Sequence, residues 1–538
     1  MLARWTTVLC LAATTACTAI SDFRIHQCNT NADCDPLSGP PLRCEQAQCT
    51  PGCADNAHCA SIDPRFPICE FRGGGCVALE SGDGECYVNT GYDAVAAGGS
   101  TAEDLVTVGA FAATARSSVW LTLQLAVDEL NAGGGVPGAT GTRPLVGVLC
   151  EDSGLAVAPG LEHVIGGLGA RGLVASLEES ALSVALPSTR GRALLLSPFG
   201  YDTERARGDS ERFAWHLGSG YAETVAGYAP LVRRAVAAFE SSGGLAAELK
   251  LAIVVSPALE DRDLWAAIAR TLVVGGDGVE SLTRLGRARE FMIVSASPEE
   301  VGEIATYRPN LVLVFASGLF TLAPHAPRSV LIERLEEATV ADPAWQPLYV
   351  FGPRNASDPT LDDLIASSES LRARSVGVRA DAPVDAAALA ALTARFHQAF
   401  PLATAQPGHP GAAPGVYDAL YLLAYSIAAA PRSAVASPAD VARGLRLVTQ
   451  SNAEVVDVGP DAVGRALELI RQGVPFNLRG VAGIGEFDAI TRARSGALRA
   501  YCWTSAGAAG FAAYDPGAAD FVTPAPSCAQ AFFAPGSN

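Results

Sequence analysis

The amino-acid sequence predicts an α/β protein built on two parallel β-sheets, with a small cysteine-rich module in front of them. Short apolar segments alternate with amphipathic helices from residue 105 to residue 198, a pattern typical of right-handed βαβ units. The alternation resumes after Pro198, and a chain of 538 residues is long enough for two or three domains. Two sets of α/β units of this length therefore predict two lobes.

The first set of elements lies between residues 105 and 198. A helix is expected over 117–130, because apolar residues recur there at the spacing of one helix face: Val119, Leu123, Ala126, Val127 and Leu130. The small residues and glycines at 131–135 end it, since they tolerate left-handed backbone geometry. The same pattern predicts strands at 105–111, 145–149, 172–177 and 193–198, with further helices at 158–168 and 178–190.

The second set follows Pro198 and has the same alternation. We expect strands at 249–255, 291–294, 311–315 and 348–351, and helices at 221–239, 263–272 and 329–338. Four more helices are expected at 386–400, 416–430, 439–449 and 461–472. The segment 485–504 predicts a hairpin-like close, in which 486–488 is followed by a turn and then by a strand at 498–503.

The N-terminus predicts export. Arg4 precedes an apolar segment at 5–16, and small residues stand before Cys17, as in a secretory signal peptide over residues 1–16. The segment resembles a bacterial lipoprotein signal, which implies that Cys17 is lipidated and that the mature protein is periplasmic or associated with the outer membrane. The alternative is ordinary signal cleavage. No later segment reaches the roughly 18–20 apolar residues that a spanning helix needs.

Twelve of the 14 cysteines remain when Cys10 and Cys17 are set aside, an even number suited to an oxidising compartment. Eight of them form an internal repeat within residues 17–86: Cys28, Cys34, Cys44 and Cys49, then Cys53, Cys59, Cys69 and Cys76. Zinc binding is possible, but no Cys-x2-Cys pair occurs and export favours disulfides. The repeat therefore predicts two four-cysteine knots of undetermined connectivity, which act either as a spacer or in protein contact.

The remaining cysteines are expected to pair as Cys502 with Cys528 and Cys86 with Cys150. Residues 87–103 are expected to form a linker between the module and the lobes, because they are rich in Ala, Gly and Ser. The net charge is −18 and Lys250 is the only lysine. An acidic surface without basic clusters argues against nucleic acid and anionic lipid as partners.

The two sets of elements resemble the periplasmic-binding-protein type I family, in particular the branched-chain amino-acid-binding receptors of ABC transporters. Four stretches carry the resemblance: 106–134, 195–198, 415–424 and 480–488. It implies a first lobe of 104–215 and 374–484, a second lobe of 216–373 and 485–528, and a hinge where the chain crosses between them. The ligand would lie between the closing lobes.

The expected ligand contacts follow the ends of strands, where α/β proteins bind ligands. The family holds its ligand carboxylate with hydroxyls at a turn that here contains Glu178, Glu179 and Ser180. The two carboxylates favour a cationic or polyol ligand over an anionic one, although helix-start acids facing solvent are an equally good explanation. Further candidates in the loops of both lobes are Phe199, Tyr201, Ser256, Ser317, Arg354 and Tyr417, the last of which is as consistent with packing.

No feature of the sequence indicates catalysis. The seven histidines are scattered, and no Gly-x-Ser-x-Gly or phosphate loop occurs. We expect no cofactor and no metal. The sequence therefore predicts an exported receptor that closes on a small polar ligand, amino-acid-like, cationic or polyol, and delivers it to an ABC permease or a sensor. The alternative is a ligand-less interaction module of the cell envelope on the same fold.

Overall fold

The structure is a computed structural model of the chain, and it describes most of the two lobes and parts of the N-terminal module. The described residues are 28–34, 42–45, 48–53, 56–69, 75–81, 86–90, 106–112, 118–137, 142–151, 156–175, 179–189, 191–198, 214–219, 221–316, 328–342, 344–353, 355, 359–379, 385–404, 412–430, 437–483, 487, 493–494, 498–515, 517–522, 528–529 and 532. Within these residues, no helix combines the length and the apolar character needed to cross a membrane.

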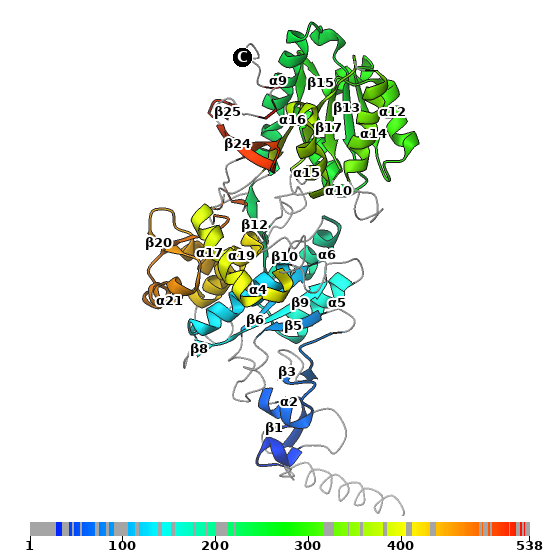
Figure 1. Cartoon of the computed structure of the whole chain (residues 1–538). Coiled ribbons are helices and arrows are strands. Elements are labelled where there is room, and N and C mark those ends of the chain that lie inside the picture. Colours follow the sequence, from blue (N-terminus) through cyan, green and yellow to red (C-terminus); the bar gives the residue numbers. More distant parts are fainter. Residues whose placement is uncertain are drawn as a thin grey trace, which may run out of the picture.

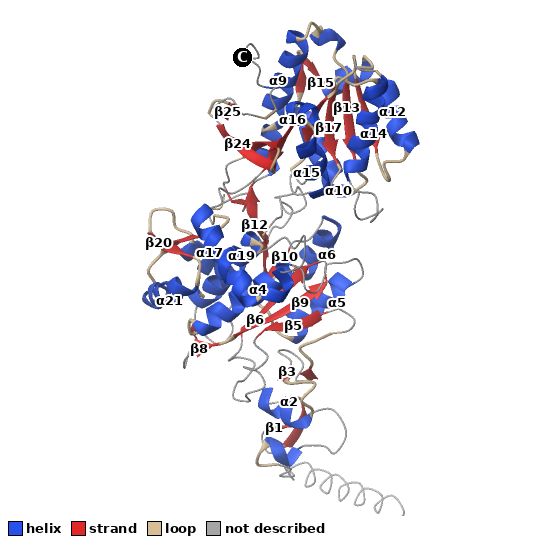
Figure 2. Ribbon diagram, in the orientation of Figure 1, coloured by secondary structure: helices blue, strands red, loops and turns tan. Residues whose placement is uncertain are grey.

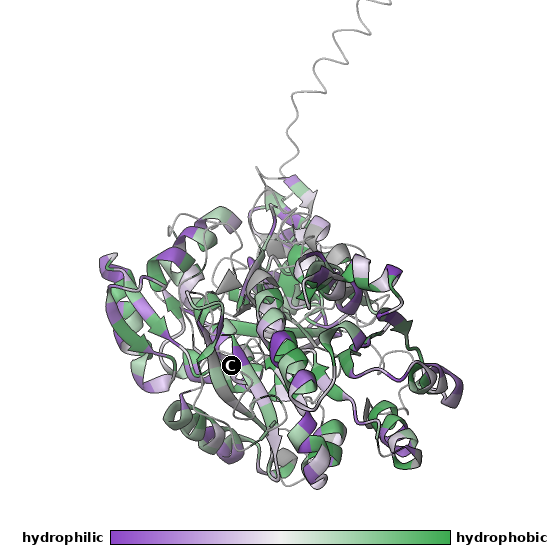
Figure 3. Cartoon of the chain, turned by 90° about the horizontal axis from the view of Figure 1, so that it is seen from above, coloured by the Kyte–Doolittle hydropathy of each residue, from purple (hydrophilic) through white to green (hydrophobic). Residues whose placement is uncertain are grey.

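Three bodies follow one another along the molecule: the N-terminal module, a first lobe and a second lobe (Figure 1). Each lobe has a β-sheet with helices packed against it (Figure 2). Hydrophobic and hydrophilic positions alternate along individual helices (Figure 3), as expected of helices with one face against a sheet. The two sheets are therefore the cores on which each lobe is built.

The sheet of the first lobe has seven strands in the order β22-β12-β11-β10-β6-β9-β5. Its central five strands are parallel, and β5 runs antiparallel at one edge. The strands are β5 (Cys86–Thr90), β6 (Val106–Ala112), β9 (Leu145–Glu151), β10 (Gly172–Ala175), β11 (Leu194–Ser197), β12 (Ala214–Ser219) and β22 (Ala493–Arg494). Numbered along the chain, the five central strands have the order 2-1-3-4-5 of doubly wound α/β folds.

Helices from two distant parts of the chain pack on this sheet. The first part supplies α4 (Ser118–Ala132), α5 (Val157–Leu161), a π-helical turn at Glu162–Gly167 and α6 (Glu179–Thr189). The second part supplies α17 (Ala386–Ala399), α18 (Pro401–Thr404), α19 (Pro414–Ala429), α20 (Pro438–Val448) and α21 (Val463–Gln472). Helix α19 is buried along almost its whole length, because α4, α20, α21 and β10 all contact it. It is the centre of the apolar core of the first lobe.

The second sheet has eight strands in the order β16-β13-β17-β18-β19-β23-β24-β25. The first five are parallel and repeat the 2-1-3-4-5 order, whereas β23, β24 and β25 are antiparallel. The strands are β13 (Leu251–Val255), β16 (Ala288–Met292), β17 (Leu311–Phe315), β18 (Leu348–Phe351), β19 (Ser375–Arg379), β23 (Arg499–Thr504), β24 (Gly507–Asp515) and β25 (Asp520–Val522). Its helices include α8 (Tyr221–Ala226), α9 (Tyr228–Ser241), α10 (Leu259–Thr271), α11 (Val279–Arg284), α12 (Pro298–Tyr307), α14 (Arg328–Ala341), α15 (Pro359–Ser367) and α16 (Glu369–Arg374).

Two features of the C-terminal half differ from the sequence-based expectation. Strand β19 hydrogen-bonds to β18 and β23 in the second sheet, although 374–484 was expected in the first lobe, and β22 joins the first sheet, although 485–528 was expected in the second. The expected hairpin within 485–504 is wrong, because β23 pairs with β24 across a tight turn at 505–506. The chain thus crosses between the sheets after β12, after β19 and between β22 and β23.

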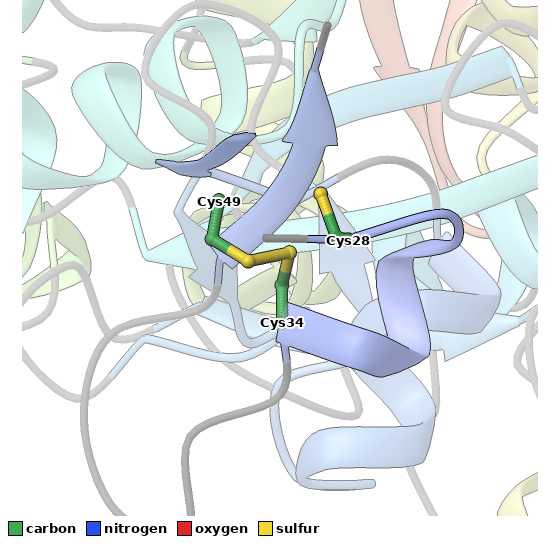
Figure 4. Close-up of side chains that lie close together, drawn as sticks. All are labelled: Cys28, Cys34 and Cys49. Carbon is green, nitrogen blue, oxygen red and sulfur yellow. A yellow bond between two sulfur atoms is a disulfide. The ribbon is translucent and has the colours of Figure 1, made fainter. Parts of the chain in front are cut away.

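The N-terminal module is held by disulfides that pair the same way in both groups of cysteines. The first cysteine of each group bonds to the third and the second to the fourth: Cys28–Cys44 and Cys34–Cys49, then Cys53–Cys69 and Cys59–Cys76. In Figure 4 the bond between Cys34 and Cys49 lies beside the sulfur of Cys28. These clustered sulfurs are already bonded in pairs, so none is a thiolate that could ligate a metal. Two further disulfides join Cys86 to Cys150 and Cys502 to Cys528.

Candidate functional site

The connections between the lobes make the carboxyl ends of both sheets face the same boundary. Strand β12 is parallel to its neighbours and leads directly into α8 of the second lobe, so the carboxyl ends of β6, β10 and β11 point towards that lobe. Strand β19 is parallel to β18 and leads back to α17 of the first lobe, so the carboxyl ends of the second sheet point the opposite way. The boundary between the lobes is therefore the place where a doubly wound fold binds ligands.

Among the helices that begin at this boundary, one from each lobe meets the other. Helix α6 follows β10 and helix α10 follows β13, and the two helices contact one another across the lobes (Figure 1). In each sheet the strand order reverses beside one of these helices, between β6 and β10 in the first and between β13 and β17 in the second. The backbone N–H groups at the starts of α6 and α10 thus lie at the boundary between the lobes, and helix N-termini of this kind can bind anionic groups.

Ser256 shapes the start of α10. It lies at the end of β13, where its N–H donates to the carbonyl of Phe315 at 2.9 Å. Its hydroxyl donates to the carboxylate of Asp261 at 2.5 Å and accepts from the N–H of Ala258 at 3.2 Å. Both side chains are buried. The hydroxyl of Ser256 therefore fixes the loop that carries α10.

Comparison with known proteins shows which fold this arrangement is. No protein-family model and no curated protein matches the sequence. A solved structure of a putative branched-chain amino acid ABC transporter protein from Silicibacter pomeroyi matches with 15% identity and a TM-score of 0.50, over 79% of this chain and 98% of that one. The branched-chain amino acid transporter substrate-binding protein LivJ from Streptococcus pneumoniae, solved with isoleucine, matches with 13% identity and a TM-score of 0.50, over 78% and 100%.

The chain has the type I periplasmic-binding-protein fold. The fold class expected from the sequence is therefore confirmed. Identities of this size establish the fold alone.

Seven of the nine expected ligand contacts lie outside the residues whose side chains the structure describes. Glu178, Phe199, Tyr201, Ser317 and Arg354 lie outside the described residues. Glu179 and Ser180 form the first two positions of α6, where only the backbone is described. The backbone of α6 thus places these two residues at the boundary between the lobes.

Tyr417 is a packing residue, which corrects its inclusion among the ligand contacts. It lies fully buried on α19, the helix that fills the core of the first lobe. Its hydroxyl donates to Glu129 and accepts from the guanidinium of Arg395 at 3.0 Å. The hydroxyl of Tyr421 also donates to Glu129, at 2.9 Å. Burial raises the pKa of the Tyr417 hydroxyl. The network ties α4, α17 and α19 together and leaves Tyr417 no exposed surface for a ligand.

The structure points to one residue that the sequence did not single out. Asn355 lies in the loop after β18, where its N–H donates to the carbonyl of Gly352 at 3.1 Å. The hydroxyl of Tyr501 donates to the same carbonyl at 3.0 Å. The side chain of Asn355 is buried, and its amide nitrogen has no acceptor among the described residues. In the sequence, the only signal for Asn355 was its position in a loop after a strand, and Arg354 has the same position.

Proposed function

We propose that the protein is a solute-binding receptor that closes its two lobes on a small polar ligand. The observation that supports this proposal most strongly is the pair of sheets with the same 2-1-3-4-5 order, whose carboxyl ends point at each other across three chain crossings. A ligand that contacts both edges would hold the lobes together, and closure of this kind is a hinge motion around the crossings. The LivJ protein of the same fold was solved with isoleucine.

The ligand class follows from the residues at the start of α6. Glu178 and Glu179 would place two carboxylates where hydroxyls of the amino-acid receptors meet a ligand carboxylate. Because like charges repel, this site would favour a cationic or polyol ligand, including an amino-acid-like molecule with an exposed amine. Ser180, Phe199 and Tyr201 from the first lobe and Ser317 and Arg354 from the second would complete the contacts. No catalytic step is proposed.

Delivery and location belong to the same proposal. The receptor would be exported by the signal at residues 1–16, be anchored by lipid on Cys17, and pass its ligand to an ABC permease or a sensor. The lobes would then be held outside the cytoplasm, where the six disulfides are stable. We take the first lobe to comprise 104–215 and 374–484 and the second lobe 216–373 and 485–528, except that the whole of β12 and β22 belong to the first sheet and β19 belongs to the second.

The test is native mass spectrometry of the full mature protein, followed by melting measurements with amino acids, amides, polyamines, sugars and polyols. A ligand at a hundred times its Kd should stabilise the folded state by about 2.7 kcal/mol. The variant Glu178→Gln/Glu179→Gln should lose most of the melting shift. Glu280→Gln is the matched control, since Glu280 is an exposed first-turn acid of α11, which precedes β16 and lies away from the facing edges. A protein that none of these compounds stabilises would contradict the receptor and favour the interaction module.

A further inference from the structure

The N-terminal module is joined to the first lobe by a strand and a disulfide. Strand β5, which begins at the last cysteine before the lobes, pairs antiparallel with β9 at the edge of the first sheet. Cys86 lies opposite Cys150 in this pairing, and a disulfide joins the two. The expected linker at 87–103 therefore begins with residues that belong to the sheet of the first lobe.

Apolar side chains of the module enter the core of the same lobe. Ile68 of β3 (Ile68–Cys69) and Leu79 are buried in one apolar cluster with Val148, Leu161 and Val164, which belong to β9 and the helix beside it. Val77 packs against this cluster as well. Burial of a side chain of this size contributes roughly 1.5–3 kcal/mol. The contact is thus a packed interface.

A side-chain hydrogen bond also crosses the interface. The Nε2 atom of His163 lies 2.9 Å from the carbonyl oxygen of Leu79, so this ring nitrogen donates to the module. His163 belongs to the π-helical turn Glu162–Gly167 of the first lobe. This interface therefore combines a directional polar contact with the apolar packing of Leu79.

The second lobe shares none of these contacts in the part of the chain that the structure describes. Its two apolar clusters contain no described residue before Val225. Figure 1 likewise shows the module beside the first lobe, at the end away from the second. The described interface of the module therefore belongs to one lobe.

We propose that the described residues between 53 and 90 form a rigid mount for the first lobe, so that this lobe keeps a fixed orientation relative to the module and the second lobe carries the motion of closure. The role in closure rests on the proposed receptor function, whereas the rigidity of the mount does not. During closure the first lobe would then stay fixed relative to the module while the second lobe moves. With a flexible spacer, both lobes would move relative to the module.

The test measures three distances in the full chain by electron–electron resonance, with spin labels on noncanonical amino acids at Ser61, Gln472 and Leu285. These exposed positions lie on α2 (Asn56–Ile62) of the module, on α21 of the first lobe and after α11 of the second lobe. The Ser61–Gln472 distance should be narrowly distributed and unchanged by every compound of the ligand panel. A broad distribution for this pair would overturn the proposal.

The other two pairs separate this proposal from the receptor function. A compound that shifts Gln472–Leu285 should shift Ser61–Leu285 with it. If no compound shifts the Gln472–Leu285 distance, the proposed receptor function is contradicted. The Ser61–Gln472 distance then still tests the rigidity of the mount. In Cys86→Ser/Cys150→Ser the Ser61–Gln472 distribution should broaden, and in the control Cys502→Ser/Cys528→Ser it should not. If the distribution stays narrow after loss of the Cys86–Cys150 bond, the contacts of Ile68, Leu79 and His163 must supply the rigidity. Leu79→Asp should then broaden the distribution, and a narrow distribution in this variant too would overturn the proposal.

Discussion

The two lobes have the same central strand order, but different parts of the chain complete their sheets. In the first lobe the edge beside β9 is covered by β5, which belongs to the N-terminal module and is fixed by Cys86–Cys150. In the second lobe the edge beside β19 is extended by β23, β24 and β25 from the C-terminal end, where Cys502–Cys528 lies. In each lobe an edge strand of the parallel core therefore pairs with a strand from outside that core, and the outer edge of the sheet passes to β5 or β25.

The C-terminal end should matter most for the second lobe. Phe532 is fully buried in the apolar cluster of that lobe, next to Ala529, whose N–H donates to the carbonyl of Arg372 at 3.0 Å. Phe532→Ala should lower the free energy of unfolding by about 3–5 kcal/mol, because it leaves a cavity. Urea unfolding measures the change. Val522→Ala, on an exposed side chain of β25, is the control, and an equal loss in both variants would contradict this account.

The N-terminal end should matter next, and for the first lobe. The variant Cys86→Ser/Cys150→Ser should destabilise this lobe by about 2–4 kcal/mol, because the bond closes a long loop. Thermal unfolding of the purified oxidised protein checks the size of the effect. Loss of Cys34–Cys49 by double serine substitution should leave the first lobe unchanged, since that bond lies within the first cysteine group. A shift of the lobe transition in that control would show that the whole module acts as one unit.

A glycine distinguishes the central strands of the two sheets. A Cβ on Gly109 of β6 would lie 2.4 Å from Cδ2 of Leu173 and 3.1 Å from Cγ2 of Val164, whereas β13 in the second lobe contains no glycine. Gly109→Ala should therefore cost about 1–3 kcal/mol through overpacking. Gly464→Ala, in an open position of α21, should be neutral or slightly stabilising. Chemical denaturation measures the free energy of unfolding of both variants. If Gly109→Ala does not change it, the core of the first lobe is less tightly packed around Gly109 than described.

The smallest expected effect is a pH dependence of the stability of the first lobe, which originates at His163. Burial lowers the pKa of His163 below its usual 6.5, so the unfolded chain binds the proton more readily. The stability from this residue is complete above pH 6.5 and is lost as the pH falls from 6.5 to the folded pKa. Melting temperatures between pH 5 and 8 should show this loss, and His163→Gln should remove it. An unchanged pH profile in that variant would exclude His163 as its source.

Much of the fold could be predicted because its strands are short runs of large apolar residues. The expected strands at 311–315 and 348–351 have the observed bounds of β17 and β18. Strand β24 was missed, since its Ala- and Gly-rich sequence has little β propensity and its place depends on pairing with β23. Strand β12 was missed for a similar reason, because its alternation of large and small residues is brief.

The site could be predicted only in outline. Strand ends locate it, because topology alone brings the carboxyl edges of the two sheets together. The role of a single residue depends on its surroundings, which the sequence does not contain. Tyr417 follows a plausible helix start, but α19 is enclosed by α4, α20 and α21, and this enclosure turns the residue into a core contact. The buried amide of Asn355 is likewise visible only once β17, β18 and Tyr501 are in place.

The spacing of the disulfides along the chain also predicts an order of bond formation during folding. The four bonds of the cysteine groups each join residues 15 to 17 positions apart, whereas Cys86 must reach a partner 64 positions further along. Because the chain is synthesised from its N-terminus, we expect the disulfides of each cysteine group to form before either lobe has folded. Cys86 should remain a thiol until β9 has been synthesised, so formation of the Cys86–Cys150 bond should accompany formation of the first sheet. Trapping free thiols on the growing chain would reveal this sequence of bond formation.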